Sequence, residues 1–222
     1  MLRNIFRKIN FQTIRFNLHY FPLKQAIKLP VLLSSNVYLK KMEGKVTINA
    51  PLKSGMIKIG YGDVGIFDEK RSRTIWQVRG EVIFNGIADI GHGAKLSVYH
   101  PDAKLILGNN FQITAESSIV AVKEIEFGKD CFLSWDILIM DSDLHDIKNE
   151  SGRIINKPKK ITIGDHVWIG CRSLVLKGAA IPSNTIIGAN SFVGNGSVLE
   201  GSNCSFAGNP IKCLKRNVDW EK

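Results

Sequence analysis

Aliphatic residues recur at every sixth position between residues 161 and 198, and this spacing is the clearest pattern in the chain. The six positions are Ile163, Ile169, Val175, Ile181, Ile187 and Val193. A small or β-branched residue stands four places after each of them, at Val167, Ser173, Ala179, Thr185, Ser191 and Ser197. A period of six fits neither the 3.6-residue turn of an α-helix nor the alternation of a long strand. It predicts a solenoid of short strands and sharp turns, in which three hexads close one triangular coil.

Each small residue lies two positions before the next aliphatic residue. Because residues two apart on an extended segment point to the same face, we expect both in the interior of the coil. Glycine follows the aliphatic residue at Gly164, Gly170, Gly188 and Gly194, where the turn favours a residue without a Cβ. Parallel strand pairing would then stack the coils at roughly 4.8 Å.

The pattern is weaker upstream but predicts roughly seven coils over residues 45–206. Aliphatic or aromatic residues precede glycine at Ile90, Leu107 and Phe127. The polar stretch of residues 60–80 predicts a loop that leaves the solenoid, or a widened coil. Residues 141–160 carry no hexad and predict an excursion loop, and interruptions of this length in a regular scaffold are usually functional or disordered.

Both ends of the chain lack the hexad pattern. Residues 1–44 predict an N-terminal segment that is amphipathic at first and then extended. Its first 20 residues place Leu2, Ile5, Phe6 and Ile9 at helical spacing among basic residues. Docking on the protein itself or on a neighbouring subunit is the favoured interpretation, and contact with a membrane surface is the alternative. Residues 207–222 predict a C-terminal tail.

Composition narrows the class of protein only a little. Thirty Lys and Arg against twenty Asp and Glu give a formal net charge of +10, which favours a polyanionic partner or simply a solvated basic surface. No nucleic-acid motif accompanies the charge, so no nucleic-acid partner is predicted. Cys131, Cys171, Cys204 and Cys213 form no CxxC pair and no zinc spacing, which is typical of free thiols in a reducing cytoplasm.

His145 is the candidate catalytic residue, because it stands where the regular coils stop and the excursion loop departs. An imidazole titrates near neutral pH and can take a proton from a hydroxyl group, as acyl transfer to that hydroxyl requires. Asp143 or Asp146 is expected to fix the tautomer of the ring. A surface histidine without a role is the alternative interpretation.

The order of motifs resembles the hexapeptide-repeat acyltransferases, in the branch of maltose, galactoside and polysaccharide O-acetyltransferases. These motifs are Asp141-Ser142-Asp143-Leu144-His145, the excursion loop, ITIGDHVWIG at residues 161–170, two further coils, and AGNPIK at residues 207–212. The resemblance is specific from about Cys131 to Lys215. It implies an all-β fold, a left-handed parallel β-helix, although the general preference for right-handed crossovers favours the opposite hand.

The same resemblance implies the roles of several residues. His145 would be the general base, in a site between two subunits of a homotrimer, and acetyl-CoA would lie along the groove between neighbouring coils. The implied cofactor-binding residues are Trp168, Gly170, Cys171, Ala189, Gly194, Asn195, Lys212 and Lys215. Trp168 and Cys171 would flank the pantetheine and the thioester, and the two lysines would meet phosphate groups. Gly194 and Asn195 stand where the family often has Thr-Lys.

The sequence therefore predicts an acetyl-CoA-dependent O-acetyltransferase that acts on a hydroxyl of a sugar or polysaccharide precursor by direct attack. N-acetylation of an amino sugar and O-acetylation of serine stay open as alternatives. No metal is expected, since a γ-class carbonic anhydrase needs three converging histidines. The five histidines, His19, His92, His100, His145 and His166, do not offer that spacing. A non-enzymatic scaffold would keep the hexads but would need neither His145 nor the AGNPIK tail.

Overall fold

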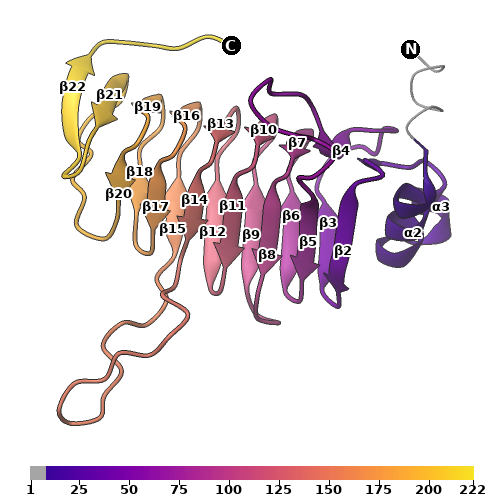
Figure 1. The fold of residues 1–222 in the computed structure, drawn as a ribbon, viewed down its shortest axis with the longest axis horizontal. Helices are drawn as coiled ribbons and strands as arrows, with labels where there is room; N and C mark the ends of the chain where they lie inside the picture. Colours follow the sequence, from indigo (N-terminus) through magenta and orange to yellow (C-terminus); the bar gives the residue numbers. More distant parts are fainter. Residues whose placement is uncertain (1–8) are drawn as a thin grey trace.

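Three parallel sheets form the sides of a triangular solenoid in the computed structural model, which describes residues 9–222 (Figure 1). Successive strands of the chain enter the three sheets in turn, so each coil contributes one strand to each sheet. This topology and its repeating register are those of the left-handed parallel β-helix, and the fold class that the hexads and the motifs predict is confirmed.

The strands are short, as the six-residue period requires. Sheet A contains β1 (Val31–Leu33), β4 (Ile57–Tyr61), β7 (Ala88–His92), β10 (Phe111–Ala115), β13 (Phe132–Trp135), β16 (Val167–Ile169), β19 (Thr185–Ile187), β21 (Cys204–Ala207) and β22 (Lys212–Arg216). Sheet B contains β2 (Val37–Met42), β5 (Thr74–Val78), β8 (Lys95–Val98), β11 (Ser118–Ala121), β14 (Leu138–Met140), β17 (Leu174–Leu176) and β20 (Phe192–Val193). Sheet C contains β3 (Lys45–Ile48), β6 (Glu81–Phe84), β9 (Lys104–Leu107), β12 (Glu124–Phe127), β15 (Ile161–Ile163) and β18 (Ala180–Ile181).

The hexad positions fill the interior as expected. Ile169 lies opposite Ile187 in sheet A, and Val175 lies opposite Val193 in sheet B, one 18-residue coil apart. All six aliphatic residues of the regular stretch are buried, and so are the first five of the six small residues. The exception is Ser197, which is half-buried. Sheet C has no strand after β18, so no complete coil encloses Ser197.

The β-helix begins earlier than the hexads indicate. Val31 and Leu33 of β1 pair in parallel with Ile57 and Ile59 of β4, and β2 pairs with β5. The first coil comprises β1, β2 and β3 and spans residues 31–48, so the interpretation of residues 21–44 as a lead-in before residue 45 is wrong. Strand β2 alternates buried and exposed residues, whereas β1 is buried throughout, and neither carries the aliphatic-glycine corner that marks later coils. Among residues 9–222 there are six complete coils and a partial seventh, and the first of them starts at Val31, ahead of the residues 45–206 for which we predict roughly seven.

Two short helices close the N-terminal end of the solenoid. These are α2 (Phe11–Tyr20) and α3 (Leu23–Ala26), which lie beside the first coil at the indigo end of the ribbon (Figure 1). Phe16 is buried, and its ring meets the interior Trp76 edge to face at 5.1 Å. Trp76 donates a hydrogen bond from Nε1 to the hydroxyl of Tyr20 (3.0 Å), and burial raises the pKa of Tyr20 to about 12.

The two interpretations of the N-terminal segment stay open. Helix α2 docks on the first coil, but it also exposes Phe11, Ile14 and Leu18. Leu2, Ile5 and Phe6 lie outside the described residues, and Ile9 precedes the helix. No helix among residues 9–222 is both long and apolar enough to span a membrane.

Polar side chains of α2 satisfy the exposed edge of β1. Asn17 donates from Nδ2 to the carbonyl of Val31 (2.7 Å) and to that of Thr13 (2.7 Å), and its Oδ1 accepts from the Val31 N–H (3.3 Å). The Thr13 hydroxyl accepts from the Leu33 N–H (2.9 Å) and donates to the Leu33 carbonyl (3.1 Å). An edge strand with unpaired backbone groups would otherwise invite pairing with another chain.

We expect Asn17→Ala to lower the free energy of unfolding by about 2–4 kcal/mol, because three hydrogen bonds are lost and a buried N–H is left unpaired. Denaturant unfolding followed by circular dichroism measures the change. Leu18→Ala is the matched control on the exposed face of the same helix and should change stability little. Equal stability of the two variants would contradict a capping role for the hydrogen bonds between α2 and β1.

Candidate active site

The excursion loop leaves the solenoid at the corner between sheets B and C. Residues 141–160 connect β14 to β15 and project away from the prism, as the loop at the lower left of Figure 1 shows. A single antiparallel bridge between Lys148 and Ile154 folds the loop back on itself. The predicted excursion is confirmed with the boundaries that the hexads indicate.

Asp141 fastens the base of this loop. Its carboxylate is fully buried and accepts three backbone N–H groups of the coil below, from Val122 (2.7 Å), Lys123 (2.8 Å) and Glu124 (2.7 Å). Its own carbonyl accepts from the N–H of Lys159 at 3.0 Å, so the first and second-last residues of the loop are held together. The sequence marks Asp141 only as the start of a motif, since the backbone groups that bind it lie almost twenty residues away.

Asp143 and Lys177 hold the next part of the loop against the solenoid. The Lys177 ammonium group donates to the Asp143 carboxylate and to the carbonyl of Asn156 (3.1 Å). Asn156 donates from Nδ2 to Asp143 Oδ2 (2.7 Å) and to the carbonyl of His145 (2.7 Å). The hydrogen bond from Lys177, followed by that from Asn156, lowers the pKa of Asp143. Lys177 belongs to the coil that follows β14, so its charge holds the excursion loop against the solenoid.

His145 is exposed on this anchored loop. Asn156 binds its backbone carbonyl, but no hydrogen bond within residues 9–222 joins its ring to Asp143 or Asp146. The structure therefore does not bring the Asp143 carboxylate to the imidazole, because Lys177 and Asn156 occupy it. The roles of His145 as base and of Asp143 as its partner stay predictions.

The candidate cofactor residues around Gly170 lie on two adjacent coils, as the 18-residue spacing predicts. The Gly170 N–H donates to the Ile187 carbonyl (2.7 Å), and the Asn190 N–H donates to the Cys171 carbonyl (2.8 Å). A Cβ on Gly170 would stand 2.6 Å from the backbone nitrogen of Ala189, so this approach requires glycine. Cys171 is half-buried and Ala189 is exposed beside it.

Trp168 lies on the outer face of sheet A, where the C-terminal segment covers it in part. Its Nε1 donates to Ser134 Oγ (3.1 Å). Trp220 stacks on the His166 ring at 4.5 Å, and its centroid lies 6.2 Å from that of Trp168. Asp219 Oδ1 is 2.9 Å from His166 Nε2, and Trp220 Nε1 donates to the His166 carbonyl (3.2 Å). Nothing in the sequence pattern predicts that the C-terminal segment covers this face, because the residues that it contacts lie more than fifty residues upstream.

The remaining cofactor candidates fall into two separate places. Lys212 and Lys215 are exposed on β22, which pairs antiparallel with β21 at the C-terminal end of sheet A. Gly194 and Asn195 follow β20 in sheet B. A Cβ on Gly178 would stand 2.8 Å from Asn195 Oδ1, so Asn195 stacks over the turn that carries Lys177. Gly194 and Asn195 therefore lie on the side of the excursion loop.

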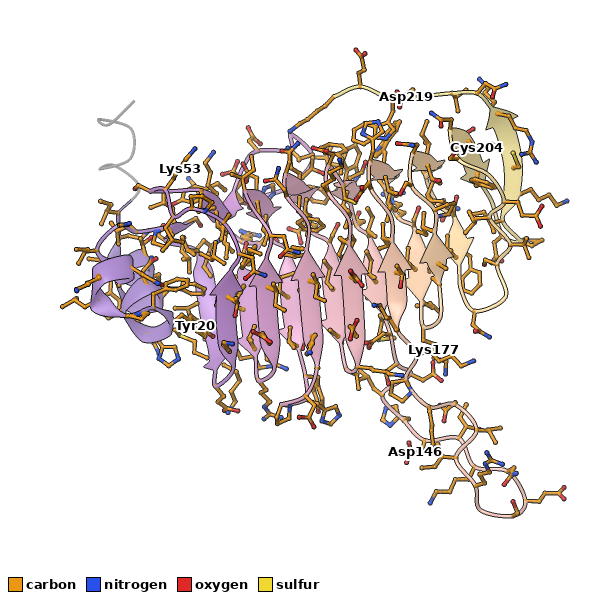
Figure 2. The ribbon with its side chains drawn as sticks, turned by 180° about the vertical axis from the view of Figure 1, so that it is seen from behind. Tyr20, Lys53, Asp146, Lys177, Cys204 and Asp219 are labelled. Atoms are coloured by element: carbon orange, nitrogen blue, oxygen red, sulfur yellow. The ribbon has the colours of Figure 1, made fainter. Side chains whose placement is uncertain are left out.

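The described part of one chain does not assemble all of these residues into one site. Trp168 and the C-terminal segment lie on sheet A, whereas His145 lies on the loop between sheets B and C. Figure 2 shows Asp219 along one long edge of the molecule and Asp146 and Lys177 along the opposite edge. The two groups of residues therefore lie apart from each other on one chain.

The side chains that could bind a metal ion lie apart from one another. Within residues 9–222, no three His, Cys, Asp or Glu side chains converge in a group that could hold a metal ion. All four cysteines are free thiols. Burial raises the pKa of Cys131 to about 12, which keeps that thiol protonated at neutral pH. Cys171 is half-buried beside the groove between coils.

Comparison with known proteins defines the class. Residues 160–201 match the bacterial transferase hexapeptide (six repeats) family, and the structure shows that its coil geometry extends far upstream of these residues. The chain is a hexapeptide-repeat transferase. It is related to the polysialic acid O-acetyltransferases: it is 34% identical over 122 residues to that of Escherichia coli O1:K1, and 39% identical over 77 residues to that of Neisseria meningitidis. These alignments span only 39% and 34% of the two enzymes.

Two longer similarities extend over most of the chain. The crystal structure of the polySia specific acetyltransferase NeuO superposes with a TM-score of 0.51 at 26% identity, over 87% of this chain and 79% of that one. The "Uncharacterized 24.8 kDa protein in cps region" of Klebsiella pneumoniae is 28% identical over 214 residues, which are 95% of this chain and 87% of that protein. The likeness therefore includes the early coils and the excursion loop as well as the regular hexads.

We expect Lys177→Met to release the excursion loop without unfolding the solenoid. The lowered pKa keeps Asp143 charged at neutral pH, so the substitution removes a salt bridge and the hydrogen bond to Asn156. Hydrogen exchange of residues 143–156, followed by mass spectrometry, should become at least several-fold faster, while the melting temperature changes little.

Lys157→Met is the matched control, since Lys157 is an exposed lysine of the same loop. It should leave the exchange of residues 143–156 as in the wild type. Equal protection of the loop in wild type and Lys177→Met would show that Lys177 does not anchor it.

Proposed function

We propose that this protein is an acetyl-CoA-dependent O-acetyltransferase that acetylates a hydroxyl group of a sugar or polysaccharide precursor. The observation that carries the proposal is the anchored loop with the exposed His145, which interrupts the coils of a chain related to polysialic acid O-acetyltransferases. A scaffold would have no use for a twenty-residue loop whose base is fastened by a buried carboxylate and whose middle is fastened by a lysine.

His145 would act as the general base. Its imidazole takes the proton of the acceptor hydroxyl while that oxygen attacks the thioester carbonyl, and the proton then passes to the departing CoA sulfur. Backbone N–H groups of an adjacent coil would stabilise the negative charge on the carbonyl oxygen. The ring is free of hydrogen bonds within residues 9–222, so one nitrogen can face the acceptor while the other meets an orienting group.

The acyl donor would lie along the groove between coils. Gly170, Cys171 and Ala189 lie where two coils approach closely. Gly170 is buried there, and the half-buried Cys171 and the exposed Ala189 would border a pantetheine arm. Trp168 offers a flat apolar wall beside it, which Trp220 extends. Lys212 and Lys215 are exposed cations at the end of sheet A that suit the phosphates of the nucleotide.

The split of the two groups of residues supports a homotrimer with its sites between subunits, which is the arrangement that the family resemblance implies. The loop of one chain and sheet A of the same chain lie on opposite edges of the prism (Figure 2). A cyclic arrangement places the loop of each copy against sheet A of the next, and closure produces identical sites. Gly194 and Asn195, beside the loop, would then face the same donor from the other side.

The acceptor is proposed as a saccharide. The relatives are named for O-acetylation of polysialic acid, which is an anionic polysaccharide, and this chain has a net charge of +10. A surface with excess positive charge draws a polyanionic chain toward it and raises the rate of encounter, more strongly at low salt.

We expect His145→Ala to lower kcat by roughly 10²–10⁴-fold, with little change in KM for acetyl-CoA, because proton removal is lost and donor binding is not. Release of the CoA thiol, measured against a panel of monosaccharides, nucleotide sugars and acidic oligosaccharides, gives both constants. His100→Ala removes an exposed histidine elsewhere on the solenoid and is the matched control. Near-wild-type turnover of His145→Ala at saturating donor would overturn the catalytic assignment.

Cys171→Ala separates direct attack from a covalent thioester route. Direct attack predicts that the variant keeps kcat within a few-fold, with a moderate rise in KM for acetyl-CoA since Cys171 borders the groove. A loss of more than about a hundred-fold in kcat, together with an acetylated wild-type protein in the mass spectrum, would establish Cys171 as the nucleophile instead.

A further inference from the structure

A buried histidine at the other end of the solenoid has no assigned partner. His92 ends β7 with 3% of its surface exposed, and within residues 9–222 neither ring nitrogen has a hydrogen-bond partner. Buried polar groups are almost always hydrogen-bonded, and leaving one unpaired costs free energy. Each of the two nitrogens has less than 1 Å² of accessible surface, so a molecule in the neighbouring cavity reaches one of them only if the ring turns.

The ring lines a cavity of about 470 Å³ at the corner between sheets A and B. This volume lies within the range of roughly 300–1,000 Å³ that is typical of small-molecule sites. Three successive coils build the cavity, through Ser34 after β1, Gly60 in β4 and His92 in β7. A Cβ on Gly60 would stand 3.0 Å from Ser34 Oγ and 3.2 Å from Thr74 Oγ1, so glycine keeps the floor of the cavity open.

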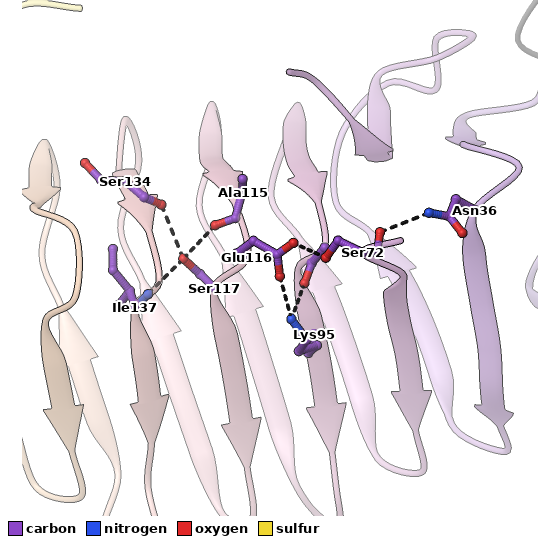
Figure 3. Close-up of polar contacts among 9 residues, drawn as sticks. Asn36, Ser72, Lys95, Ala115, Glu116, Ser117, Ser134 and Ile137 are labelled. Carbon is purple, nitrogen blue, oxygen red and sulfur yellow. Dashed lines mark hydrogen bonds and ion pairs between the residues drawn. The ribbon is translucent and has the colours of Figure 1, made fainter. Parts of the chain in front are cut away.

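The loop that walls the cavity is held in place. Asn36 donates from Nδ2 to the carbonyls of Glu69 (2.8 Å) and Ser72 (2.9 Å), and the Ser72 hydroxyl donates to the Glu116 carboxylate (Figure 3). Lys95 donates to the other Glu116 oxygen at 2.8 Å. The predicted loop within residues 60–80 is thus an ordered wall, and the cavity is formed before any ligand arrives.

The chemistry of the lining indicates the kind of ligand. A neutral imidazole offers one donor and one acceptor, and a hydroxyl group can satisfy either. The other lining groups are mainly hydroxyls and an amide, from Ser34, Ser35, Asn36 and Thr74. Glu116 is already neutralised by Lys95, and Glu69 and Lys70 at the rim carry opposite charges. No excess of positive charge faces the cavity, which disfavours a phosphate or a carboxylate as the main recognised group.

We propose that this cavity binds one sugar residue, with one of its hydroxyl groups bonded to His92 once the ring turns toward the cavity. The cavity lies at the corner of sheets A and B, whereas the excursion loop lies at the corner of sheets B and C, so the two sites are distinct. The inference goes beyond the proposed function, because saccharide binding here requires neither acetyl-CoA nor His145.

The test is a binding measurement without acetyl-CoA. Isothermal titration and saturation-transfer NMR with a panel of hexoses, N-acetylhexosamines, sialic acid and their oligomers should find at least one saturable ligand. Ser35→Trp fills the mouth of the cavity from an exposed position and should weaken this ligand at least tenfold without loss of thermal stability. His92→Phe should do the same by removing both nitrogens while keeping the bulk of the ring.

Two control variants test whether the saccharide occupies this cavity. His100→Phe, at an exposed histidine outside the cavity, and His145→Ala should both bind as the wild type does. Absence of any saccharide binding would mean that water alone fills the cavity, and the proposal would fall. Binding that Ser35→Trp and His92→Phe both retain would place the saccharide elsewhere and overturn it equally.

A kinetic measurement on Ser35→Trp distinguishes two origins of the bound sugar residue. If the sugar residue is a distal residue of the acceptor chain, Ser35→Trp should raise KM for an oligosaccharide acceptor but not for a monosaccharide. The KM for acetyl-CoA should stay unchanged. If the sugar residue belongs to a separate saccharide ligand, Ser35→Trp should lose saccharide binding while the KM of every acceptor stays unchanged. Because the binding arm needs no turnover, failure of the proposed acetyl transfer would leave the result on the cavity intact.

Discussion

Backbone pairing between successive coils is the constraint on which the rest of this structure depends, at a repeat of 18 residues from β16 to β19 and of 20 residues from β10 to β13. Each strand hydrogen-bonds to the strands of the coils before and after it, so Ile169 must lie opposite Ile187 and no side chain can shift alone. In the regular hexads each side of the triangular coil places one aliphatic side chain and one small or β-branched residue in the interior, whereas earlier coils place two large ones there, such as Ile125 and Phe127 of β12. Where two coils approach most closely, even a Cβ is excluded, as Gly170 shows against Ala189. Residues one coil apart therefore have a spacing that the scaffold sets.

A solenoid built this way has two open ends, and the chain closes each with a different device. At the N-terminal end, α2 lays Phe16 over the interior Trp76 and binds the free edge of β1 through Asn17. At the C-terminal end, β22 adds to β21 in the antiparallel sense, and all its residues are exposed. Three of its five residues are Lys212, Lys215 and Arg216, and such charges discourage further strand pairing. The proposed phosphate contacts thus come from an element that first serves to end a sheet.

What could be predicted from the sequence follows from whether a feature is local and repeated. The hexads identify the coils from residue 161 onward, because every coil there repeats the same residue types. The first coil escapes this pattern, since β1 and β2 lack the aliphatic-glycine corner. The position of His145 and the boundaries of its loop are visible as a break in the repeat. The partners of Asp141, the stacking of Trp220 on His166 and the unpaired nitrogens of His92 depend on contacts far apart in the chain, which no local pattern records.

The two loops that interrupt the repeat are held in place in the same physical way. A long insertion in a solenoid loses conformational entropy when it is ordered, and the regular hydrogen bonds of the coils do not hold it. The excursion loop meets this cost through Asp141, whose carboxylate binds three N–H groups of the coil below. The earlier loop meets it through Asn36, whose amide binds the carbonyls of Glu69 and Ser72. In both places a polar side chain binds backbone groups across the corner, so the insertion becomes a fixed wall. One wall presents His145 to the outside of the prism, and the other encloses His92. The chemistry that we propose for this protein therefore lies at corners where a coil is interrupted and then fastened, while the unbroken coils keep those corners in register.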